Sequence, residues 1–67
     1  MKILFEWELD PEREEYSVTA SCDTRRTLMV FPARCNDPMN LATMALAEAR
    51  GVFSDVHWTH LEWRPKA

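Results

Sequence analysis

The segment that most constrains the fold is one with both a helix start signal and a helix stop signal. Asp37 is suited to cap the first free amide groups, Pro38 fits the first helical position, and Gly51 fits the left-handed residue after the last turn. The sequence therefore predicts a helix over residues 38–50. One side of this helix is apolar and is expected to pack on a sheet; it consists of Leu41, Ala42, Ala45, Leu46 and Ala49.

Most of the remaining chain shows the two-residue period that is typical of strands. Alternation predicts strands over residues 2–9 and 16–23, and an apolar run predicts a third over residues 27–33. A segment rich in strand-forming residues predicts a fourth over residues 56–63. The turn at residues 23–26 contains no glycine, which favours a loop of about three to five residues over a two-residue turn.

These elements predict a two-layer α+β fold in the order β-β-β-α-β. The expected sheet has four strands, is mostly antiparallel, and carries the helix of about residues 38–50 on one face. A chain of 67 residues has room for a single domain, residues 1–67. We prefer pairing of the last strand beside the first, which gives the sheet order 3-2-1-4; pairing beside the third strand is the alternative. Pro32 places the end of the third strand at a sheet edge or a bulge.

The chain has more large apolar side chains than one helix can cover. Hydrophobic residues make up 46% of the sequence, and the third predicted strand is apolar on both faces. One helix on a four-stranded sheet leaves the other face open, and an exposed apolar patch usually marks a surface for a partner. Because tryptophan is favoured as an interface anchor, Trp58 and Trp63 are candidate partner-binding residues.

The acidic residues are concentrated near the start of the chain. The net charge is −3, and residues 1–15 alone carry six acids against two bases. A carboxylate recurs at every second position, and these candidate partner-binding residues are Glu6, Glu8, Asp10, Glu12 and Glu14. In an extended chain such residues lie about 6.6 Å apart, so the row could imitate a phosphate backbone in a basic groove. The other interpretation is a solvated strand face that prevents edge-to-edge aggregation.

No pattern predicts catalysis, a metal or a cofactor. The spacing of the potential zinc ligands Cys22, Cys35, His57 and His60 differs from that of structural zinc sites. One glycine is too few for a phosphate-binding loop. We therefore expect a protein that is not an enzyme and that uses neither metal nor cofactor.

The sequence also lacks the signals of membrane insertion and export. No apolar run approaches the length of a membrane span, and Glu6 and Glu8 interrupt the start of the chain before a signal-peptide core can form. Two cysteines are few for a small secreted domain, which favours reduced thiols and a cytoplasmic location. Direct nucleic-acid binding through Arg25, Arg26 and Arg34 is not expected, because the surrounding charge is acidic.

Taken together, the small size, acidity and excess of interface-type residues resemble the small phage-encoded inhibitors of the anti-CRISPR type. The resemblance covers the overall layout and no motif. It implies a stoichiometric inhibitor that docks on a larger nucleic-acid-handling protein or ribonucleoprotein complex, with the acidic row in place of nucleic acid. The alternative is a small structural or regulatory homodimer that pairs an edge strand or the open sheet face with its own copy.

Overall fold

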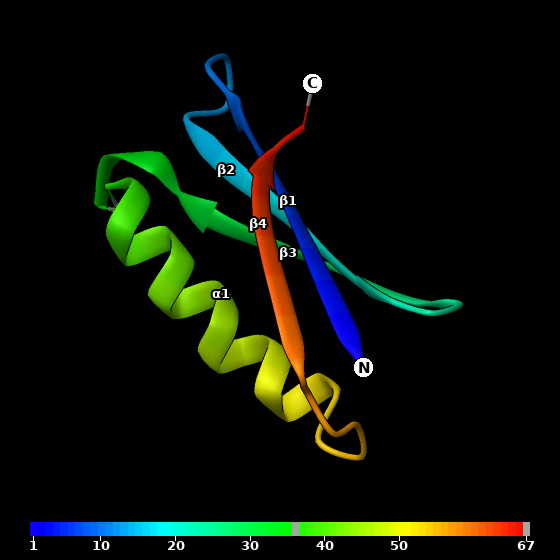
Figure 1. The fold of residues 1–67 in the computed structure, drawn as a ribbon. Helices are drawn as coiled ribbons and strands as arrows, with labels where there is room; N and C mark the ends of the chain where they lie inside the picture. The colour runs from blue at the N-terminus through cyan, green and yellow to red at the C-terminus, as the bar shows by residue number, and fades with distance from the viewer. Residues whose placement is uncertain (36, 67) are drawn as a thin grey trace.

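In the computed structural model, which describes residues 1–35 and 37–66, four strands form one sheet and one helix lies across one of its faces (Figure 1). The strands are β1 (Lys2–Asp10), β2 (Glu15–Cys22), β3 (Arg25–Pro32) and β4 (His60–Pro65). The helix is α1 (Pro38–Val52), and a short 3₁₀ turn, η1 (Ala33–Cys35), comes before it. The side chains of Cys35 and Pro38 lie outside the described part.

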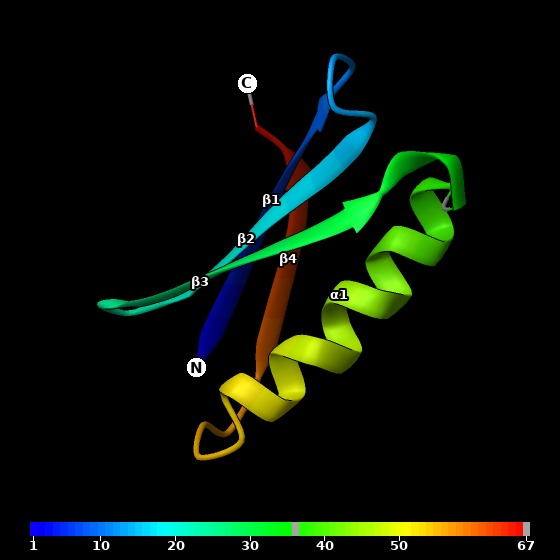
Figure 2. The ribbon, with the colours of Figure 1, turned by 180° about the vertical axis from the view of Figure 1, so that it is seen from behind.

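The strand order is β3-β2-β1-β4. β1 pairs antiparallel with β2, β2 pairs antiparallel with β3, and β4 runs parallel to β1. This confirms the predicted α+β class and the preferred sheet order 3-2-1-4. α1 carries the chain from the β3 edge back across the sheet to the β4 edge. Over its whole length it lies on the same face of the sheet (Figures 1 and 2).

The core lies between α1 and the sheet. The predicted apolar side of the helix is confirmed, since Leu41, Ala45 and Ala49 are fully buried. Alanine at two of these three positions lets the helix backbone approach the strands closely. The strands contribute alternate residues to the same layer, and these buried side chains are Ile3, Phe5, Val18, Ala20, Cys22 and Met29.

The helix begins as predicted but ends differently. The Asp37 side chain accepts a hydrogen bond of 2.9 Å from the backbone N–H of Asn40, which is an N-cap. At the other end, Gly51 is helical, has no positive φ, and α1 continues to Val52. Phe53 is the C-cap, and its N–H donates to the Ala49 carbonyl at 2.8 Å. The Arg25 guanidinium donates to the Val52 carbonyl at 3.1 Å and so satisfies one of the acceptors left free at the helix end.

The β2–β3 connection is shorter than predicted. Cys22 pairs directly with Arg25, so only Asp23 and Thr24 connect the two strands. Asp23 has a φ of 56°. Aspartate tolerates this left-handed conformation better than most residues, which is why a two-residue turn forms here without glycine.

The last strand begins later than predicted. Residues 56–59 are irregular, and regular pairing with β1 starts at His60 opposite Lys2. The N-terminal amino group donates to the His57 carbonyl and to the Thr59 hydroxyl, so the start of the chain holds this segment in place. Trp58 precedes the regular strand, so its position on the helix side does not depend on the alternation that places Trp63 there.

Candidate docking surface

The face of the sheet opposite α1 is not covered by any element in the described ranges, and we call it the open face (Figure 2). Its side chains alternate with those of the core. Along the central strand β2 they are small hydroxyl groups, and on both sides of β2 they are larger, so the open face has a shallow hollow. The residues that line the hollow are Glu6, Glu8, Ser17, Thr19, Arg26, Leu28 and Lys66.

The apolar part of the open face lies on β3. Leu28 is 65% exposed and Val30 is 52% exposed, although both lie in the middle of a regular strand. Arg26 precedes them on the same face, and we call Arg26, Leu28 and Val30 the β3 edge patch. Long apolar edge strands that remain uncovered promote association with other chains.

β3 is an edge strand because it pairs only with β2 in the described sheet. Cys22 and Arg25 flank a two-residue turn, and such a pair exchanges both of its backbone hydrogen bonds. By alternation, the backbone groups of Arg26, Leu28 and Val30 point away from β2 toward the free edge. Pro32 follows Val30 by two residues, so its backbone nitrogen has the same orientation. This fits the rule that proline is tolerated in a strand where the N–H group that it lacks would face away from the neighbouring strand. The edge position predicted from Pro32 is confirmed.

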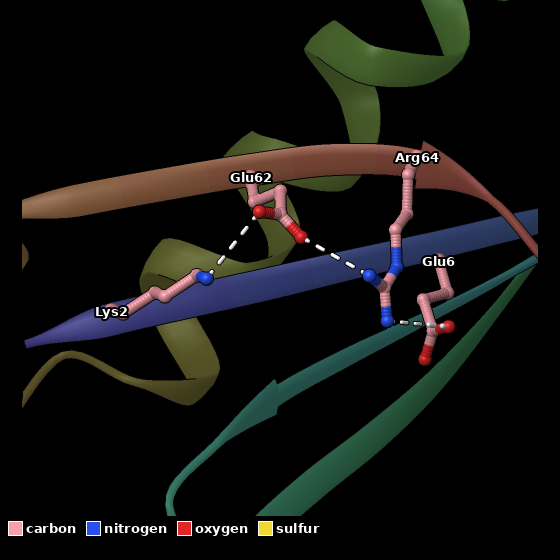
Figure 3. Close-up of polar contacts among 4 residues, drawn as sticks. All are labelled: Lys2, Glu6, Glu62 and Arg64. Carbon is pink, nitrogen blue, oxygen red and sulfur yellow. Dashed lines mark hydrogen bonds and ion pairs between the residues drawn. The ribbon is translucent and has the colours of Figure 1, made fainter.

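The other half of the open face is charged but nearly neutral. Figure 3 shows a chain of ion pairs that links β1 to β4: Lys2 to Glu62 at 3.3 Å, Glu62 to Arg64 at 3.4 Å, and Arg64 to Glu6 at 3.5 Å. A separate pair joins Lys66 to Glu8 at 3.8 Å. The parallel register places these residues side by side, since Glu6 is directly opposite Arg64.

The predicted acidic row is therefore divided between two environments. Glu6 and Glu8 lie on the open face, and each forms an ion pair with a base from the C-terminal part of the chain. Asp10 ends β1 and accepts backbone hydrogen bonds from Glu12 and Arg13. Glu12 and Glu14 lie in the β1–β2 turn, where Glu14 has a φ of 52°, so the extended row stops at Asp10.

The negative charge of the molecule is concentrated in this turn. Residues 10–15, which we call the acidic turn, contain four acids and one base, a balance of −3. The whole chain has eleven acids and eight bases, also −3, so the remaining residues balance to zero. The acids of the acidic turn are Asp10, Glu12, Glu14 and Glu15.

The two candidate tryptophans lie on the helix side of the sheet. Trp58 meets the buried ring of Phe5 edge-on at a centroid distance of 6.4 Å, and Trp63 lies 5.8 Å from the same ring. Both are partly buried against the core. Trp63 also lines a small apolar cavity of about 90 Å³ between α1 and β4, whose other lining residues are Phe5, Ala42, Leu46 and Leu61.

One ion pair fixes the start of β3 to the segment after α1. Arg25 Nη1 donates to both carboxylate oxygens of Asp55 at 2.9 Å, and its guanidinium lies 5.1 Å from the centre of the Phe53 ring. The hydrogen bond from Arg25 lowers the pKa of Asp55 below its ordinary value. These contacts hold the strand that carries the β3 edge patch against the core.

The structure also places the residues considered for metal binding. Cys22 is a free thiol buried in the core, whereas His57 and His60 are exposed, and the side chain of Cys35 lies outside the described part. Within residues 1–35 and 37–66 no three histidine, cysteine or acidic side chains are grouped so as to hold a metal ion. In the same ranges no helix combines the length and apolarity needed to cross a membrane.

Two bases of the open face, Arg64 and Lys66, do not stand out in the sequence, because their pairing with Glu6 and Glu8 depends on β4 lying next to β1. The signal that could have found them is the alternation of Glu62, Arg64 and Lys66, which has the same two-residue period as the acidic row.

Comparisons with protein families, with curated proteins and with solved structures gave no match.

Proposed function

We propose that the protein is a non-enzymatic binding protein that docks on a larger nucleic-acid-handling complex as a stoichiometric inhibitor. The observation that carries the proposal is the β3 edge patch, in which Leu28 and Val30 remain 65% and 52% exposed on a free edge. Exposure of apolar side chains such as Leu28 and Val30 to water is unfavourable, and an unpaired strand edge can accept a further strand. Docking of a protein on this surface is therefore favoured over exposure to solvent.

The class of partner is inferred from the charge distribution. The acidic turn carries a balance of −3, while the rest of the chain balances to zero. In the proposed complex this turn faces a basic surface, of the kind that nucleic-acid-handling proteins present, and directs the apolar edge onto it. Glu12 and Glu14 are the main charged contacts, because Glu6 and Glu8 already have intramolecular partners.

The proposal is tested by capturing the partner complex with tagged protein from the native host and measuring how much nucleic acid the captured complex still binds. Val30→Lys places a charge in the β3 edge patch, and Val52→Lys is its control, because Val52 is 43% exposed at the end of α1. A second comparison uses a Glu12→Lys/Glu14→Lys variant, with Glu48→Lys as an exposed control of the same charge type.

We expect the wild type and both controls to capture one complex and to displace its nucleic acid, and we expect both test variants to lose capture. Wild-type capture should also weaken as salt is added, because salt screens the attraction between the acidic turn and a basic surface. If Val30→Lys captures as well as Val52→Lys, the β3 edge patch is not the docking surface and the proposal is wrong.

A further inference from the structure

The β3 edge patch is complementary to itself. We propose that, in the absence of the larger partner, it is occupied by a second copy of this chain, so that two four-stranded sheets join through antiparallel β3 strands. The inference rests on the proposed function in one respect, since both require the β3 edge patch to be a docking surface. The inference adds which molecule occupies the β3 edge patch before the larger partner binds.

The first argument is the register of the two strands. When the two-fold axis passes between the Met29 residues, Leu28 of each copy lies opposite Val30 of the other. The backbone groups of Leu28 and Val30 point toward the free edge, so each such pair can exchange both backbone hydrogen bonds. The same arrangement keeps both open faces on one side of the joined sheet and brings the four exposed apolar side chains together.

The second argument is charge complementarity. In this register Arg26 lies opposite Pro32 of the second copy, and Pro32 pairs within its own sheet with Glu15. Glu15 of the second copy is then two strand spacings, about 10 Å, from Arg26 on the open face, with only a proline between them. The long arginine side chain can reach across this distance to the acidic turn of the other copy.

Antiparallel pairing also separates like charges. The bases of β3 are both at its start, Arg25 and Arg26, and the two copies of Arg26 come to lie about 20 Å apart at opposite ends of the joint. A shift that places Leu28 opposite Leu28 instead sets Arg26 against Val30 of the second copy. It also removes Arg26 from the position next to Glu15.

The opposite sheet edge is less suited to such pairing. β4 has six residues, ends at Pro65, and presents Glu62 and Arg64 to the open face, where they form the ion-pair chain of Figure 3. Charged side chains and proline are the features by which edge strands resist addition of another chain. β3 is longer and has apolar residues at its centre, so the second copy is assigned to β3.

The oligomeric state of the full chain tests the inference. Light scattering and sedimentation equilibrium at micromolar concentrations should give twice the chain mass of 7.9 kDa for the wild type and for the Val52→Lys control. Val30→Lys should raise the dimer dissociation constant about a hundredfold or more, because a two-fold interface contains each substitution twice. A wild type that stays monomeric at several hundred micromolar, or a Val30→Lys variant that stays dimeric, overturns the inference.

A mixing experiment tests the register and is independent of how one variant folds. Leu28→Glu and Val30→Lys each weaken the homodimer, but in a mixture position 28 of the first variant lies opposite position 30 of the second. On one side of the two-fold axis the introduced carboxylate and the introduced ammonium group then lie opposite each other. On the other side the unchanged Val30 of the first variant lies opposite the unchanged Leu28 of the second. We expect dimers to reappear on mixing the two variants. No recovery, with circular dichroism showing both variants folded, contradicts the register.

The two proposals fail in different ways. If the wild type is monomeric but Val30→Lys loses capture of the larger partner, the proposed function stands and the second copy is wrong. If the wild type dimerises through Val30 but partner capture is insensitive to Val30→Lys, the second copy stands and docking of the larger partner on this edge is wrong.

Discussion

At the scale of single residues, Gly51 occupies a helical position that makes no use of a missing side chain. It has no positive φ, and a Cβ built on it meets no atom within 4 Å. Glycine in a helix is less favourable than alanine, largely because it loses more backbone freedom on folding. Gly51→Ala should therefore raise the free energy of unfolding by about 0.5–1 kcal/mol in urea denaturation.

The control for this prediction is the reverse exchange at an exposed helical alanine, Ala47→Gly, which should lower the free energy of unfolding by a similar amount. A loss of stability in Gly51→Ala would show that the glycine is left-handed after all. The sequence suggested a left-handed stop because Gly51 follows the last periodic residue. At the observed helix end the Val52 carbonyl accepts a hydrogen bond from Arg25, far away in the chain, and no local signal reveals this contact.

At the scale of elements, the Arg25–Asp55 ion pair joins β3 to the segment after α1 and makes stability depend on pH. The pKa of Asp55 is lowered from about 3.8 by the hydrogen bond from Arg25. The pair therefore stabilises the fold above pH 3.8, and this contribution is lost as the pH falls from there through the lower pKa of the folded state. Asp55→Asn should melt below the wild type at pH 7, with a gap that narrows toward pH 2.

Thermal melting at several pH values measures this gap. Asp23→Asn is the matched control, because Asp23 forms no ion pair in the described part of the chain and asparagine also tolerates its φ of 56°. The control should melt close to the wild type at every pH. A gap for Asp55→Asn that stays constant from pH 7 to pH 2 would mean that the ion pair does not contribute to folding.

Elements whose signals are local could be predicted from the sequence, and elements fixed by distant contacts could not. Asp37 marks the helix start and the alternation around Val18 marks β2, because both signals lie within a few neighbouring residues. The start of β4 depends instead on where the N-terminal amino group binds, 58 residues from Thr59. Hydrophobic periodicity and strand propensity therefore cannot predict the irregular path of residues 56–59.

At the scale of the whole molecule, the sheet order decides what each charge can do. The sequence shows the carboxylates Glu6 and Glu8 as members of one row, but only the parallel pairing of β4 with β1 brings Arg64 and Lys66 to them. What remains unpaired on the open face is the apolar part of β3, where Leu28 and Val30 alternate with the buried Met29. The excess of apolar residues predicted a partner surface, but not its position on an edge strand.

A protein that pairs through β3 should melt at a temperature that depends on its concentration, because association stabilises the folded chain and not the unfolded one. Over a hundredfold range of concentration the wild type should melt several degrees higher at the upper end. In Val30→Lys this dependence should disappear, and in Val52→Lys it should remain. A wild-type melting temperature that is constant over the whole range would show that the folded chain gains no stability from a second copy, and that Leu28 and Val30 face water until a different partner arrives.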